Sequence, residues 1–115
     1  MTGDEVDAYC ASLPGTDMIV QWADSHIWKV SGKVFVIHGP ASASISVKTN
    51  SVETAQMLID AGVGVKAPYC HRSWLNLQIS SDTEEVHHRI ASSYRIIRAK
   101  LTKKAQAALP PLPAS

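Results

Sequence analysis

The stretch WKVSGKVFVI, residues 28–37, decides the fold that this sequence predicts. It consists of two short apolar runs on either side of Ser31 and Gly32, a pair that is typical of a tight β-turn. We therefore expect a β-hairpin whose strands cover residues 26–30 and 33–37.

The register of this hairpin determines which side chains reach the core. If Val30 pairs with Lys33, the buried face carries the largest side chains: Trp28, Val30, Phe35 and Ile37. The opposite face then carries Ile27, Lys29, Val34 and Val36. A bulge at Gly32 would exchange the faces on one strand, so the outward direction of Lys29 depends on a regular hairpin.

Alternating side chains predict further strands. A run from Met18, MIVQW, is expected to form the first strand, and SISVKT at 44–49 places Ile45 and Val47 on one side. The run SWLNLQIS at 73–80 alternates strictly. Its apolar side carries Leu75, Leu77 and Ile79, and its polar side carries Trp74, Asn76 and Gln78.

Capping signatures and apolar stripes predict three helices. Residues 2–5 have the spacing of a capping box before a helix over 4–12, and Asn50 with Glu53 precedes a helix over 51–61. Asp82 with Glu85 begins a final helix. Its apolar stripe keeps helical spacing through Val86, Ile90, Ser93, Ile97 and Leu101.

These elements predict an α+β fold, a two-layer αβ sandwich in which helices cover one face of an antiparallel sheet. With 115 residues and 45% apolar content, the chain can bury one core, so we expect a single domain over residues 1–104. The proline-rich segment 105–115 is expected to be a flexible tail.

Charge is distributed unevenly along the chain, although the formal net charge is only +1. All acidic residues lie at or before Glu85, so residues 86–115 contain lysine and arginine but no aspartate or glutamate. This pattern predicts a localised basic element near the C-terminal end and argues against a uniformly basic protein.

The sequence contains no recognisable catalytic or metal-binding motif. Cys10 lies on the apolar stripe of the first helix, which favours a buried thiol, and Cys70 with His71 are neighbours that rarely point at one spot. His87 and His88 diverge by about 100° on a helix and cannot chelate one ion together. We expect no enzymatic activity, metal, cofactor or small-molecule substrate.

The acidic start MTGDEVDAYC lacks a long apolar stretch, so neither a signal peptide nor a membrane span is expected. Two distant cysteines without a CxxC spacing suit a reducing compartment. We expect a cytoplasmic monomer.

Five segments follow one another along the chain: CASLPGT at 10–16, WKVSGKVFVI at 28–37, SISVKT at 44–49, Trp74 and SYRIIRAKLTKK at 93–104. Together they resemble the MmcQ/YjbR family of small bacterial proteins across about residues 5–104. The resemblance implies a fold similar to that of frataxin and CyaY, and a double-wing DNA-binding motif.

The open sheet face and the hairpin predicted above offer a candidate surface for duplex DNA, the partner that the resemblance implies. Lysine and arginine contact phosphates, asparagine and glutamine can read base edges, and tryptophan can stack. The candidate residues are Lys29, Lys33, Lys48, Arg72, Trp74, Asn76, Gln78 and Arg98. Equally, lysines at sheet edges can serve only to prevent aggregation, and outward polar residues can simply be hydrated.

Two other functions stay open. A frataxin-like protein would bind metal through Asp4, Glu5 and Asp7 of the first helix, although carboxylates near a helix N-terminus also complement its dipole. A protein-interaction module would use Trp74 and the open sheet face as an apolar patch.

Overall fold

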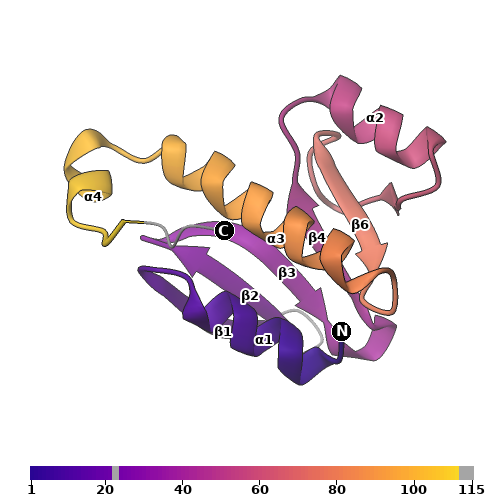
Figure 1. Ribbon diagram of the computed structural model, residues 1–115, viewed down its shortest axis with the longest axis horizontal. Helices are drawn as coiled ribbons and strands as arrows, with labels where there is room; N and C mark the ends of the chain where they lie inside the picture. The colour runs from indigo at the N-terminus through magenta and orange to yellow at the C-terminus, as the bar shows by residue number, and fades with distance from the viewer. Residues whose placement is uncertain (22–23, 112–115) are drawn as a thin grey trace.

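A computed structural model describes residues 1–21 and 24–111 as a six-stranded antiparallel sheet with helices on one face (Figure 1). The strand order is β1-β2-β3-β4-β6-β5. The strands are β1 Thr16–Gln21, β2 Ser25–Val30, β3 Lys33–Gly39, β4 Ser44–Lys48, β5 Val65–Lys66 and β6 Trp74–Gln78. The predicted two-layer α+β sandwich is confirmed. Trp22 of the expected first strand lies outside the described residues.

The helical layer is formed by α1 Gly3–Ser12, α2 Val52–Asp60, α3 Thr83–Ala99 and the short α4 Lys103–Ala107. A 3-10 turn, η1 Pro40–Ser42, connects β3 to β4. The core lies between the layers, where Val6 and Cys10 of α1 and Ile90 and Tyr94 of α3 pack against the sheet. None of the helices in the described ranges combines the length and apolarity that crossing a bilayer requires.

The β2–β3 hairpin contains a bulge that the sequence did not mark. Val30 pairs with Lys33 as expected, but Lys29 pairs with Val34 and Trp28 with Val36, so Phe35 is an extra residue on β3. Val36 therefore joins Trp28 in the core.

The predicted faces of two β3 residues are consequently wrong. Ile37 pairs with Ile27 on the face away from the helices, and Val36 takes the core position expected for Ile37. The register is shifted by a bulge within β3, and the turn at Gly32 is regular.

Ser93 of α3 explains why the bulge is stable. Its hydroxyl donates to the carbonyl oxygen of Phe35 at 2.6 Å and accepts from the backbone N–H of Lys48 at 2.9 Å. Phe35 and Lys48 do not pair with each other, because the ladder between β3 and β4 ends at Val36 and Val47. A single buried hydroxyl thus serves two backbone groups that the sheet leaves unpaired, which accounts for a serine in an apolar stripe.

The helix ends follow the predicted capping chemistry with one change. Thr2 and Glu5 form a reciprocal capping box, and Asp82 accepts from the N–H groups of Glu84 and Glu85. The N-cap of α2 is Ser51, whose hydroxyl accepts from the N–H of Thr54, and not Asn50.

Part of the proline-rich segment is packed against the domain. Residues 103–107 form α4, and Leu109 lies so close to Gly15 that a Cβ there would come within 2.1 Å of its Cδ2. Arg98 donates to the carbonyl oxygen of Pro110 at 2.7 Å. The segment up to Pro110 therefore packs against Gly15, which follows α1, and against Arg98 of α3. Residues 112–115 lie outside the described residues.

Candidate functional sites

The antiparallel topology gives the sheet two chemically different ends. We call the end that carries the β2–β3 turn the basic end. The starts of β1, β3 and β6 and the last residues of β2, β4 and β5 lie there. The C-terminal half of α3 reaches the same end, because Tyr94 donates to the carbonyl oxygen of Pro14 at 2.5 Å.

Nearly all cationic side chains of the chain belong to elements that meet at the basic end. All basic residues lie within the described ranges, and Arg89, paired with Glu85 at 3.2 Å on the N-terminal half of α3, is the exception. The others are Lys29, Lys33, Lys48, Lys66, Arg72, Arg95, Arg98, Lys100, Lys103 and Lys104. Two acidic residues, Asp17 and Glu53, accompany them.

We call the opposite end of the sheet the acidic end. The start of α1, the residue before β2 and the start of α3 all lie there, and the N-terminal ammonium donates to the carbonyl oxygen of Ile79 at 2.6 Å. Figure 1 shows the two ends on opposite sides, with α4 on the left and the N-terminus on the right. The acidic residues at the acidic end are Asp4, Glu5, Asp7, Asp24, Asp82, Glu84 and Glu85.

Three of the predicted site residues form a row across the open face at the basic end. Lys48 pairs with Trp74, and Lys29 lies two strands away on β2. Because neighbouring strands are about 4.8 Å apart, the backbones of Lys29 and Lys48 are separated by roughly 10 Å. Asp17 pairs with Lys29 across β1 and β2, so this row also contains one carboxylate.

The remaining predicted residues do not share that row. Lys33 is exposed beside the hairpin turn and pairs with the core residue Val30, so its side chain starts on the helix-covered side. Arg72 is exposed in the loop before β6. Arg98 lies in the helical layer, where it donates to the hydroxyl oxygen of Tyr94 at 3.0 Å.

The two amides of β6 lie on the open face but away from the row. Asn76 donates its side-chain N–H groups to the hydroxyl oxygens of Ser44 and Ser46 at 3.2 and 3.1 Å. Gln78 is exposed at the far end of β6. Most of the predicted DNA-binding residues therefore lie at the basic end of the molecule, but only some of them lie on the open face.

Lys48 links the cations of the sheet to those of the helices. Burial lowers the pKa of its ammonium group, and repulsion from Lys100 lowers the pKa further. Its Nζ donates to the hydroxyl of Ser73. Positive groups from β4 and from the residue after α3 are therefore close enough to affect each other.

The open face is hollowed and partly overhung. A cleft of about 710 Å³ lies between Ile37, Ser46 and Asn76 of the sheet and the loop residues Tyr69 and Cys70. Tyr69 is fully exposed beside it. This loop covers part of the face that the sequence led us to expect bare.

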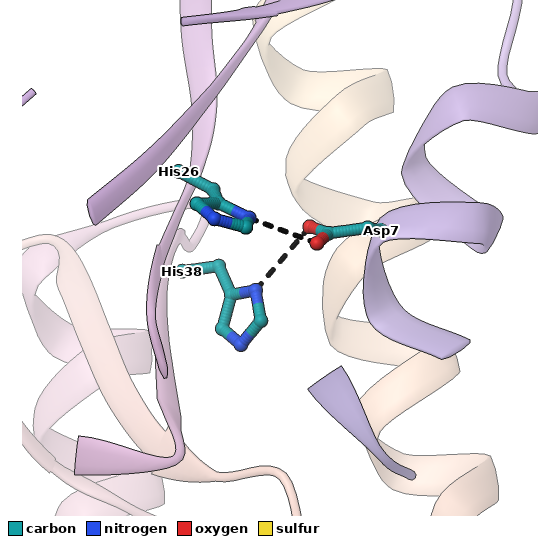
Figure 2. A group of neighbouring side chains, drawn as sticks. All are labelled: Asp7, His26 and His38. Atoms are coloured by element: carbon teal, nitrogen blue, oxygen red, sulfur yellow. Dashed lines mark hydrogen bonds and ion pairs between the residues drawn. The ribbon is translucent and has the colours of Figure 1, made fainter. Parts of the chain in front are cut away.

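At the acidic end, one carboxylate joins α1 to the β2–β3 hairpin (Figure 2). Asp7 lies 2.8 Å from Nδ1 of His26 and 3.3 Å from Nδ1 of His38, and it accepts from the indole N–H of Trp28 at 2.9 Å. Burial raises the pKa of Asp7, but the hydrogen bonds from Trp28, His38 and His26 outweigh burial, so the net pKa is lowered.

The carboxylates of the first helix do not form one exposed group. Asp7 faces the sheet, and Glu5 accepts from the backbone N–H of Thr2 in the capping box. The three carboxylates proposed for frataxin-like binding thus have different surroundings. The two histidines were missed, because a regular hairpin pairs His26 with Ile37 and only the bulge brings His38 opposite His26.

The two cysteines differ in access. Cys10 is buried in the core, as predicted, and burial raises the pKa of its thiol well above the usual range. Cys70 is half-buried in the loop over the open face, where burial also raises its pKa. Neither thiol has the lowered pKa that an activated nucleophile requires.

A six-stranded antiparallel sheet with helices on one face defines a small α+β sandwich domain. A family model described as YjbR matches residues 11–96, and the chain therefore belongs to the YjbR family. The resemblance read from the sequence is confirmed. A search of curated proteins gives no match.

The fold is shared with a solved structure, protein DR2400 of Deinococcus radiodurans, a DUF419-domain protein. The TM-score is 0.82 with 17% sequence identity, over 92% of this chain and 86% of that chain. At this identity the likeness establishes the fold alone.

Proposed function

We propose that this YjbR-family domain is a non-catalytic protein that binds duplex DNA with its basic end. The observation that supports this proposal is that every basic residue except Arg89 belongs to an element that reaches this end of the sheet. The net charge of the whole chain is a poor guide to whether it can bind DNA, because the acidic residues that balance the cations lie mostly at the other end. A phosphate backbone approaching the basic end meets a local cationic surface.

Three parts of the fold supply cations that are exposed enough to contact phosphates. Lys33 is exposed beside the hairpin turn, which would act as one wing, and Arg72 is exposed in the loop before β6. Lys103 and Lys104 are exposed in α4. These side chains would bind phosphates as point charges or forks, and the acidic end would orient the domain by repulsion from the duplex.

Binding is expected to depend little on base sequence. Asn76 donates its amide N–H groups within the sheet, and Gln78 lies at the end of β6 away from the cations. Trp74 is half-buried, so a face of its ring is partly accessible beside Lys48. Phosphate contacts without base readout give affinity that is strongly salt-dependent.

Titration of a labelled duplex of about 20 base pairs at two salt concentrations tests this proposal. At about 3.4 Å per base pair such a duplex exceeds the longest extent of the domain, 37 Å. We expect binding at low salt that weakens steeply as salt is added, for a random sequence as for any other. Absence of binding at low ionic strength would refute the proposal.

A further inference from the structure

The cluster at the acidic end has the composition of a metal site. Asp7, His26 and His38 come from α1, β2 and β3, and their ligand atoms all lie within 4.8 Å of one another (Figure 2). Two imidazoles and one carboxylate are the donors that first-row transition ions prefer, whereas Ca²⁺ and Mg²⁺ prefer oxygen alone. The donor set therefore selects for ions such as Zn²⁺ or Fe²⁺.

The spacing of the donor atoms fits a shared ion. Metal bonds to imidazole and carboxylate are about 2.0–2.2 Å long, so adjacent ligands around a tetrahedral or octahedral ion are roughly 3.0–3.5 Å apart. Nδ1 of His26 lies 2.8 Å from Oδ2 of Asp7, and Nδ1 of His38 lies 3.3 Å from Oδ1 of Asp7. Because the three ligand atoms lie within 4.8 Å of one another, an ion bound between them would draw the side chains closer together.

The surroundings of the cluster support binding and access. The indole N–H of Trp28 donates to Oδ1 of Asp7 and fixes the carboxylate, as outer hydrogen bonds commonly do for metal ligands. The side chains of Asp7 and His26 are 24% and 25% exposed, so an ion can enter from solvent and water can complete its coordination. His38 is buried behind them.

The bulge at Phe35 brings His38 into the cluster, because it places His38 opposite His26 and toward Asp7. The nitrogen of His38 that faces the carboxylate is Nδ1. Its Nε2 points away from the carboxylate, is buried and has no hydrogen-bond partner among the described residues.

We infer that Asp7, His26 and His38 bind one divalent transition-metal ion through the carboxylate and both Nδ1 atoms, which joins α1 to the β2–β3 hairpin. The ion replaces the hydrogen bonds between the carboxylate and the imidazoles. Because the cluster lies at the end opposite the cations, this inference is independent of DNA binding and each can fail without the other.

Isothermal calorimetry with Zn²⁺ on tag-free full-length protein, stripped beforehand with a chelator, tests the site. We expect one ion per chain, and affinity at least tenfold weaker for His26→Ala. The partial exposure of His26 makes that variant the least disruptive, and its melting temperature without metal checks the fold. Two matched controls are His88→Ala, at an exposed position of α3, and His71→Ala, at the exposed residue next to Cys70. Both should retain wild-type affinity for Zn²⁺.

Nitrogen-15 NMR of the histidine rings gives a second readout that does not depend on variant stability. Addition of Zn²⁺ should shift Nδ1 of His26 and His38 and leave the Nδ1 signal of His88 unchanged. The inference is overturned if no stoichiometric binding occurs, if His26→Ala binds as tightly as wild type, or if His71→Ala abolishes binding.

Discussion

The two ends of the sheet handle charge in opposite ways. At the basic end, cations lie on the hairpin, on β4, in the loop before β6 and on the last helices, and Lys48 has a pKa lowered by burial and by Lys100. At the acidic end, Asp7 is enclosed by three nitrogen donors, and its pKa is lowered. The first end keeps like charges together and accessible, which suits an external anion, whereas the second pairs unlike groups inside the protein.

Charge reversal at the basic end should have the largest effect. The triple variant Lys33→Glu, Lys103→Glu and Lys104→Glu changes three exposed side chains and should leave the fold intact. Duplex affinity at low salt should fall roughly 100-fold or more, and the slope of log affinity against log salt should decrease by about 3 if each contacts a phosphate.

The control for that experiment is reversal at the other end. Glu84→Lys is exposed at the start of α3 and should leave duplex affinity unchanged or slightly increased. Equal losses from both variants would mean that the two ends do not differ in DNA binding.

Removal of Asp7 should have the next largest effect. In Asp7→Ala, the indole N–H of Trp28 and Nδ1 of His38 lose their acceptor in a largely buried position. The free energy of unfolding should fall by about 1–3 kcal/mol, the typical cost of an unsatisfied buried group. Asp4→Ala, exposed in the same helix, should cost less than about 1 kcal/mol. Urea unfolding measures both, and equal costs would contradict a special role for Asp7.

Acid should weaken the same end. Because the folded-state pKa of Asp7 lies below its unfolded value, near 3.9, its contribution to stability is complete above about pH 4. That contribution is lost as the pH falls through the folded-state pKa. Unfolding free energies at pH 6 and pH 3 should therefore differ less for Asp7→Ala than for the wild type. A pH dependence that the variant does not reduce would show that other carboxylates are responsible.

The sequence predicted the layers of the fold well because they depend on local patterns. Alternation in SWLNLQIS placed Leu75 and Leu77 inward, and the capping box at residues 2–5 placed α1. The two-residue strand β5 has no alternation to detect. The bulge at Phe35 was missed, because its stabilising partner, Ser93, is distant in sequence and reads only as a break in an apolar stripe.

The candidate sites were harder to predict for the same reason. Individual lysines could be chosen from their strands, but which end they occupy depends on the antiparallel order of six strands. The Asp7 cluster depends on a one-residue register shift, without which His38 points to the opposite face. Long-range pairing, which periodicity does not encode, therefore determines both ends.

The smallest predicted effect concerns Lys48 and Lys100. If the cations of sheet and helix converge, Lys100→Gln should raise the pKa of Lys48, because one source of repulsion is removed while burial continues to oppose the charged form. The change should be small, since Lys100 is exposed and salt screens it. NMR titration of the Lys48 side chain measures the pKa directly, with Lys104→Gln as the matched control. An unchanged pKa in Lys100→Gln would place Lys100 too far from β4 to contribute to a common surface, and the basic end would then be two separate patches.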